Sequence, residues 1–279
     1  MLGFLVLMGS IMGGSSIGVL NNFIPVHSPF AKNAWRNGLC CVYFFIPAII
    51  EFYKLRMTIN FSTLITWKSY KNILLALFMQ VFWVFGLTFA SSRTIQSHAY
   101  LINNTHGLFI VVINLIIGKK VLPGEFRGLF FALFGCLIIL LDPNAHRRAS
   151  ETGLVQSPLI PNLVNLSSAF LGAIYFLVNS KNVNSLPIML LVLFQNVHLW
   201  FINSTLAKVM SSEDAKIEYF STDMNFGCLG FFDQRIALIA FIPFGLLCSV
   251  MGSAGYTISL LFYSPLVVSN AFLIEPIIA

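Results

Sequence analysis

The sequence predicts an all-α, polytopic membrane protein, a bundle of helices that crosses a lipid bilayer several times. Hydrophobic residues make up 57% of the 279 residues, whereas Lys, Arg, Asp and Glu together make up 9%. A soluble domain carries roughly 25% charged residues. The apolar residues also stand in long runs without the alternation of barrel strands. Because lipid offers no partner to backbone N–H and C=O groups, these runs are expected to be helices.

Nine apolar runs approach the ~20 residues that a helix needs to cross ~30 Å of hydrocarbon. In chain order they are 2–24, 39–53, 73–90, 98–117, 126–141, 163–178, 186–207, 236–262 and 266–279. The first run lacks the basic start of a signal peptide and contains closely spaced Gly and Ser, which favours a packed helix. Since the chain ends inside the ninth run, we expect the full protein to complete this helix and to add a tenth.

The charge and cysteine content exclude several classes of protein. The net charge is +6, but the 16 Lys and Arg are scattered between apolar runs, which indicates membrane-flanking charge and no nucleic-acid partner. The five Cys form no CxxC pair, so neither a metal site nor a disulfide framework is expected. The positive-inside rule favours a cytoplasmic N-terminus, because the loops after the second and fourth runs hold more basic residues than the opposite loops. The opposite loops of that half carry Lys32, Arg36 and Arg93.

Polar residues inside the apolar runs are the main functional signal. At 100° per residue they form stripes on five helices, where an unpartnered polar group facing lipid would cost several kcal/mol. The candidate binding residues drawn from these stripes and their surroundings are Gln80, Tyr100, Asn103, Asn104, His106, Ser168, Tyr175, Asn196, Ser249, Tyr256 and Glu275. Interhelical hydrogen bonding explains any single one of them. For the whole set, we expect the stripes to line a shared polar cavity.

An internal repeat is suggested by aligning the fourth run with the ninth. An offset of 169 residues sets SHAYLINNTHGLF (97–109) against LVVSNAFLIEPII (266–278). Transporters are commonly built from two such halves, and five helices per half would make the second copy inverted. The predicted division is a first repeat over 1–141, a polar connection over 142–162, and a second repeat over 163–279 that stops in its fourth helix.

The stretch from Thr94 to Asp142, together with SPLVVSNAFLIEPIIA (264–279) and its Glu-Pro pair, resembles EamA-type members of the drug/metabolite transporter superfamily. The resemblance implies ten helices and transport of a small polar metabolite, such as an amino acid, an organic amine or a nucleotide sugar. Members of this family usually carry Pro where this chain has Gly107, and an acidic residue where it has Lys119.

The offset also pairs two titratable residues, His106 beside Gly107 and Glu275 beside Pro276. Pro276 cannot donate an N–H, so the carbonyl one turn earlier is free to bind another group. Inverted-repeat transporters bind substrate and coupling ion at such loosened helices near the bilayer midplane. We therefore expect Glu275 and His106 to contact substrate or to carry a coupling proton. The alternative for each is a hydrogen-bonded structural role.

The function predicted from the sequence is a secondary carrier working by alternating access, without cofactor or metal and with the lipid bilayer as its surroundings. No nucleophile elbow, Walker loop or HExxH motif supports an enzyme. The predicted stripes contain little Lys or Arg, which argues against a doubly phosphorylated substrate. The chief alternative is a polytopic receptor or membrane scaffold that does not transport. Substrate identity, coupling ion, membrane and oligomeric state stay open.

Overall fold

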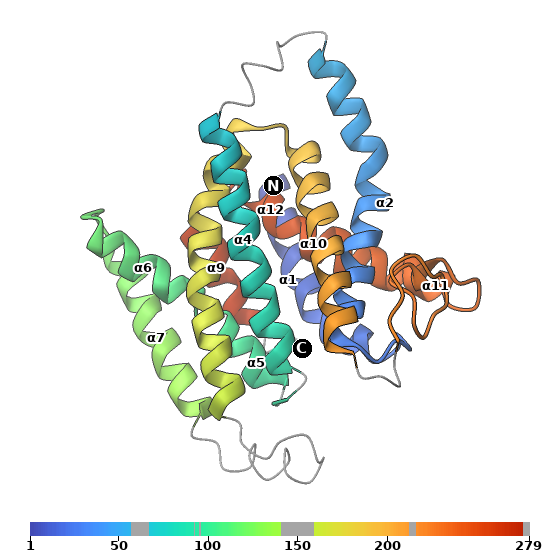
Figure 1. Cartoon of the computed structure of the whole chain (residues 1–279). Helices are drawn as coiled ribbons and strands as arrows, with labels where there is room; N and C mark the ends of the chain where they lie inside the picture. Colours follow the sequence, from blue (N-terminus) through green and yellow to red (C-terminus); the bar gives the residue numbers. More distant parts are fainter. Residues whose placement is uncertain (57–66, 92, 95, 141–158, 212–215, 276–279) are drawn as a thin grey trace. The chain divides into compact units, whose positions relative to one another are not determined.

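The structure is a computed structural model, and it describes all residues except 57–66, 92, 95, 141–158, 212–215 and 276–279. In the described residues the regular structure is helical, apart from one isolated β-bridge between Glu218 and Gly227 (Figure 1). The helices are α1 (Leu2–Asn21), α2 (Pro29–Arg56), α4 (Trp67–Ser91), α5 (Gln96–Asn103), α6 (His106–Ile116), α7 (Pro123–Leu140), α9 (Leu159–Ser185), α10 (Ile188–Met210), the 3-10 helix η1 (Gly230–Phe232), α11 (Ala237–Ile239), the π-helix η2 (Ala240–Ala254), α12 (Gly255–Ser259), α13 (Pro265–Ala271) and the 3-10 helix η3 (Phe272–Ile274).

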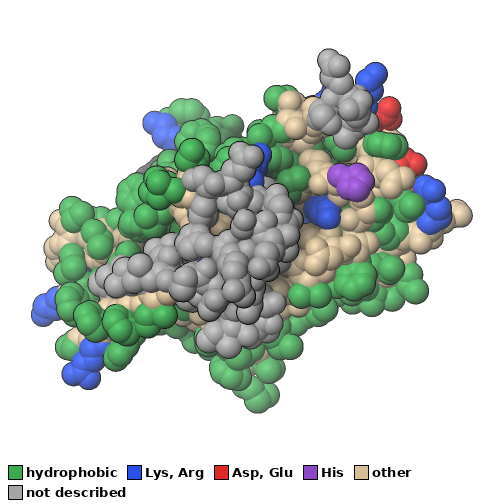
Figure 2. Space-filling view, turned by 90° about the horizontal axis from the view of Figure 1, so that it is seen from below, with side chains coloured by type: hydrophobic (Ala, Val, Ile, Leu, Met, Phe, Trp, Pro, Cys, Tyr) green, Lys and Arg blue, Asp and Glu red, His purple; other side chains and the backbone are tan. Residues whose placement is uncertain are grey.

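Seven helical segments of the described chain are long and apolar enough to span a membrane, which confirms the expected all-α, multi-pass class. They are 2–21, 29–56, 69–91, 98–116, 159–185, 188–210 and 237–259. The apolar helix α7 coincides with a further expected span, and 265–274 forms a shorter apolar helix. Apolar side chains also cover much of the face drawn in Figure 2. Phe45, Ile46 and Phe78 are each more than half exposed, as suits helices that face lipid.

Several boundaries differ from the sequence prediction. Helices α4 and α9 extend beyond their expected runs, 73–90 and 163–178. Helix α2 begins at Pro29, ten residues before the expected run, so Lys32 and Arg36 lie in a helix and not in a loop. Proline is favoured in the first turn because it has no N–H that would need a partner, and the Ser28 hydroxyl accepts the N–H of Ala31 at 3.4 Å. The ninth run is not one continuous α-helix, because α13 passes into η3 at Phe272.

Contacts between Cα atoms divide the chain into two compact units, which we describe separately. The first unit contains residues 1–77 and 179–262, and the second contains 78–178 and 263–279. Each unit draws on both ends of the sequence, so packing does not follow chain order. The division into repeats at 142–162 stays a prediction, because 141–158 lie outside the described residues.

In the first unit, α1 packs directly against η2. A β-carbon added to Gly13 would lie 2.3 Å from the amide nitrogen of Gly252 and 2.4 Å from the carbonyl oxygen of Leu247, so only glycine fits there. The Ser10 and Ser259 hydroxyls hydrogen-bond at 3.2 Å in the same contact region. Small residues thus let the backbones of α1 and the following helices approach closely, as the Gly and Ser of the first run predict.

The chain between α10 and α11 is folded against α2. The Trp35 indole N–H, on α2, donates to the carbonyl oxygen of Gly227 at 2.7 Å, and its ring packs edge-to-face on Phe231 at 6.3 Å between centroids. Trp35 and Phe231 are almost fully buried. An aromatic anchor therefore holds residues 216–236 in place, a contact between distant segments that local composition does not reveal.

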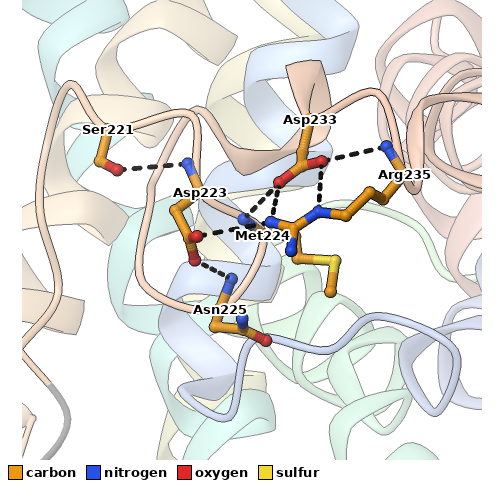
Figure 3. A network of polar contacts seen from close by, with 6 residues as sticks. All are labelled: Ser221, Asp223, Met224, Asn225, Asp233 and Arg235. Carbon is orange, nitrogen blue, oxygen red and sulfur yellow. Dashed lines mark hydrogen bonds and ion pairs between the residues drawn. The ribbon is translucent and has the colours of Figure 1, made fainter.

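An ionic network stiffens this loop, which we call the anchored loop (residues 216–236). The Arg235 guanidinium donates to Asp233 at 2.5 Å and reaches Asp223 at 3.5 Å, while backbone N–H groups of Met224 and Arg235 also donate to Asp233 (Figure 3). The Arg235 hydrogen bond and charge hold the pKa of the Asp233 carboxyl well below its usual range. Asp233 therefore stays ionised at neutral pH.

Candidate functional site

The predicted binding residues fall into both compact units. The second unit contains Gln80, Tyr100, Asn103, Asn104, His106, Ser168, Tyr175 and Glu275, and the first contains Asn196, Ser249 and Tyr256. All of them are buried except Tyr256, which is partly exposed. Burial of so many polar groups confirms that the stripes do not face lipid. The shared cavity itself stays a prediction.

Two interrupted helices position the predicted titratable pair in the second unit. Helix α5 ends at Asn103 and α6 begins at His106, with a turn between them. In the other, α13 gives way to η3, and Glu275 follows directly. The two starts, Gln96 and Pro265, are separated by the same 169 residues as His106 and Glu275. The helix loosening expected near Gly107 is therefore present, two to three residues earlier than the glycine.

The two interruptions meet at a buried hydrogen-bonded junction. The Asn104 amide donates to Glu275 Oε2 at 2.9 Å and to the carbonyl oxygen of Phe272 at 2.7 Å. Asn104 and Glu275 are 2% and 1% exposed. The Phe272 carbonyl also accepts the backbone N–H of Glu275 at the end of η3. The carbonyl that the sequence predicts to be free therefore has donors within the described chain.

Gly107 lies in a close contact between α6 and α13. A β-carbon there would lie 2.6 Å from Asn270 Oδ1 and 2.7 Å from Ser269 Oγ, both on α13. A larger residue at position 107 would therefore displace these two side chains.

His106 lies beside the junction in an aromatic cluster formed with Trp83, Tyr175 and Phe176. Its ring stacks on Phe176 with 4.8 Å between centroids and 11° between planes, and Trp83 lies 5.6 Å away. Nδ1 is 3.0 Å from the carbonyl oxygen of Asn103. A carbonyl can only accept, so Nδ1 carries the proton. Nε2 is buried and has no hydrogen-bond partner in the described part of the chain, so it is available to a ligand or a proton.

Other predicted residues of the second unit are held by interhelical hydrogen bonds. The Asn103 amide donates to Asn165 Oδ1 at 3.1 Å, and Asn165 donates to the Ala99 carbonyl at 2.7 Å. The Ser168 hydroxyl instead donates within its own helix, to the Asn165 carbonyl at 2.7 Å. The interhelical contacts of Asn103 and Asn165 are the kind that the packing alternative requires. A role of Asn103 and Ser168 in substrate binding stays a prediction, as it does for Gln80, Tyr100 and Tyr175.

In the first unit, the predicted residues bond within their own helices. The Asn196 amide donates to the Val192 carbonyl at 2.9 Å, which leaves its buried Oδ1 without a partner among the described residues. The Ser249 hydroxyl donates to the Phe244 carbonyl five residues earlier, in register with the π-helix. Asn196 therefore keeps one free acceptor, whereas Ser249 has used its donor.

The sequence prediction missed Arg36, a buried cation of the first unit. The sequence prediction placed Arg36 in a loop because it began this helix at residue 39, ten residues too late. The signal that would have found it is Ser28 followed by Pro29, a capping residue and a first-turn proline that together mark a helix start. Counted from Pro29, Arg36 lies two turns inside the helix.

The first unit also contains an apolar groove of about 610 Å³. It is lined by residues of α2, α4 and α10 and of the connection before α10, among them Phe52, Tyr70, Ile73, Leu190, Phe194 and His198. None of the predicted binding residues lines it, so it is not the expected polar site.

The described residues contain no group of three or more His, Cys, Asp or Glu that could hold a metal ion. The predicted binding residues offer hydrogen bonding and proton exchange by amides, hydroxyls, one imidazole and one carboxyl group. Comparison with family models and with curated protein sequences finds no match to this chain.

Proposed function

We propose that the chain is a multi-pass membrane carrier that moves a small polar metabolite by alternating access, similar in plan to EamA-type transporters. The observation that supports this most is the meeting of two interrupted helices at the buried pair Asn104 and Glu275. Breaking a helix inside a bilayer exposes backbone groups that lipid cannot satisfy. Carriers keep such breaks because the freed groups bind substrate or coupling ion.

The equal spacing of the two interrupted helices supports an inverted repeat. Helix starts at Gln96 and Pro265, and the residues resuming helix at His106 and Glu275, share the offset of 169 found in the sequence. In the proposed cycle the two halves rock around this region. A cytoplasmic N-terminus, inferred from the distribution of Lys and Arg, completes the proposed topology.

Glu275 is the proposed carrier of a coupling proton, and His106 its nearby second titratable group. Water reaching Glu275 from one side at a time would let its carboxyl take up a proton on one face and release it on the other. The Asn104 amide donates to one oxygen of this carboxyl group. In the proposed cycle, the loss of this contact during opening couples the movement to protonation of the carboxyl group.

Counterflow in liposomes tests the transport proposal. Vesicles loaded with an unlabelled metabolite should accelerate uptake of the same labelled metabolite for at least one member of a panel of amino acids, amines and nucleotide sugars. Acceleration for none of them would favour the receptor or scaffold alternative.

Proton coupling has a matched control within the chain. Uptake of the identified substrate should depend on pH, and Glu275→Gln should flatten this dependence. The same substitution at the exposed Glu218 should leave it intact. A folded Glu275→Gln variant that keeps the full pH dependence would remove Glu275 from the coupling role.

A further inference from the structure

We infer that Arg36 forms an anion-binding site in the first unit, and that it takes a single carboxylate or phosphate group of a soluble metabolite. The inference rests on the proposed carrier function for its biological meaning, but not for its test. It names a substrate class that the predicted polar stripes do not indicate, since those stripes contain almost no basic residues.

The central observation is a buried guanidinium without a counter-ion. Arg36 is 8% exposed, and its Nε has no hydrogen-bond partner in the described chain. The ion pairs found among the described residues join Arg235 to Asp223 and Asp233, and none involves Arg36. A buried charge is costly unless it is paired. Evolution retains such a charge in a membrane protein mainly where it serves binding or transport.

Two further buried donors of the first unit, one on α2 and one on α10, also lack partners in the described chain. Asn37, the next residue, is 1% exposed and its Nδ2 is unpartnered in the described part of the protein. On α10, the indole Nε1 of Trp200 is buried and has no hydrogen-bond partner among the described residues. A β-carbon at Gly38 would lie 3.1 Å from Trp200 Cδ1, which places this ring against α2 directly after Asn37.

All three unsatisfied groups donate, so what they lack is an acceptor. Buried donors are normally satisfied, and each one left open carries a penalty of about 1–3 kcal/mol. A carboxylate or phosphate offers several acceptor oxygens and a negative charge at once. The planar guanidinium fork binds such groups through two parallel hydrogen bonds. A neutral or cationic metabolite would leave the Arg36 charge uncompensated.

The groups around the guanidinium do not neutralise it. Its charge acts on the thiols of Cys40 on α2 and Cys248 on η2, both fully buried. Cys248 directly precedes Ser249, one of the predicted binding residues. One guanidinium supports one anionic group, which agrees with the prediction against a doubly phosphorylated substrate.

Thermal unfolding of the purified full chain in detergent tests the site without requiring transport. The probes are glutamate, succinate and glucose 6-phosphate, compared with chloride at equal ionic strength, glucose and choline. An anion present at 100 times its Kd should raise the folded-to-unfolded ratio of the wild type about 100-fold. Glucose and choline should leave it unchanged.

Replacement of Arg36 should raise the unfolding temperature, whereas replacement of a structural residue lowers it. Arg36→Met should unfold at a higher temperature than the wild type in chloride, because it removes an uncompensated buried charge. It should also lose the response to the anions. Arg235→Met removes an exposed, salt-bridged guanidinium of the same chemistry, and should keep that response. Arg36→Lys keeps the charge but lacks the fork, and should bind at least 10-fold more weakly.

Several results would overturn the inference. The first is that no anion stabilises the wild type, and the second is that anions stabilise Arg36→Met as much as the wild type. The third is that phosphatidylglycerol vesicles stabilise the protein while no soluble anion does. Should Arg36→Met not fold, an Arg36→Lys protein with unchanged anion affinity would contradict it equally. Anion binding without counterflow would instead count against the carrier and leave the site standing.

Discussion

The buried contact between Asn104 and Glu275 makes a quantitative prediction about stability. Asn104→Leu removes both hydrogen bonds of the Asn104 amide, to Glu275 at 2.9 Å and to Phe272 at 2.7 Å, while nearly keeping the volume of the side chain. Glu275→Met removes the carboxyl acceptor alone. If the two interrupted helices are joined here, the substitutions cannot act independently.

The magnitude follows from measured hydrogen bonds between membrane helices, which average about 0.6 kcal/mol and reach about 1.7 kcal/mol. Two bonds are lost in Asn104→Leu, so we expect a cost of about 1–3 kcal/mol. At about 2–4 °C per kcal/mol for a chain of this order of size, the unfolding temperature should fall by roughly 2–12 °C. The double variant should lose less than the sum of the single variants by about 0.6–1.7 kcal/mol, which is the coupling between the two side chains.

Thermal unfolding of all four proteins in one detergent measures this cycle. Asn114→Leu on α6 serves as the comparison, because its amide lies two turns from the junction. It should show no coupling to Glu275→Met. Additive losses for Asn104 and Glu275, within about 0.3–0.5 kcal/mol, would refute the junction as the link between the interrupted helices.

Three further perturbations test other parts of the fold. Gly13→Leu should prevent α1 from packing and abolish the monodisperse folded peak in gel filtration. Gly124→Leu should keep this peak, because a β-carbon at Gly124 meets open space. The same elution profile for both variants would refute the close packing of α1. Trp35→Phe keeps an aromatic ring but loses the bond to the anchored loop, so limited proteolysis should cut that loop about 5- to 30-fold faster, for a loss of about 1–2 kcal/mol. The lowered pKa of Asp233 means that its contribution to loop stability is complete at neutral pH and is lost only as the pH falls below about 4. Protection of the loop amides from hydrogen exchange, relative to the intrinsic exchange rate at each pH, should therefore fall in acid for the wild type but not for Asp233→Asn. Unchanged protection of the wild type would contradict the network.

Much of the fold could be predicted from composition and run length, because lipid imposes both. A helix that must satisfy its own backbone needs a long apolar run, so α1 and α10 begin and end within about three residues of their predicted limits. Helices α4 and α9 contain their predicted runs but extend several residues beyond them. The start of helix α2 was predicted wrongly, because the helix begins ten residues before its apolar run. Its first turns carry Lys32, Asn33 and Arg36, and they are helical because the anchored loop covers that end, a tertiary effect that hydropathy cannot detect.

The candidate site could be predicted by residue type but not by partner. The polar residues that the sequence singles out inside apolar runs include Asn104 and Glu275, and both are buried. The Phe272 carbonyl, predicted to be free because of Pro276, has donors from Asn104 and from the Glu275 backbone. That Asn104 rather than His106 reaches Glu275 depends on the turn at Asn104 and Thr105, which rotates α6 relative to α5. A straight-helix projection cannot contain such a turn. The unpartnered donors near position 36 could not be predicted either, because the start of α2 was placed ten residues too late.

The central claim is that the buried polar groups at the interrupted helices serve transport and not packing alone. Metabolite exchange by Glu275→Gln, normalised to the amount of folded protein in the vesicles, tests this claim most directly. Glutamine can still accept from Asn104, so the fold should persist with an unfolding temperature close to that of the wild type, while exchange should fall by at least 10-fold. Exchange that stays at the wild-type rate, or falls only in proportion to lost folded protein, would contradict the claim.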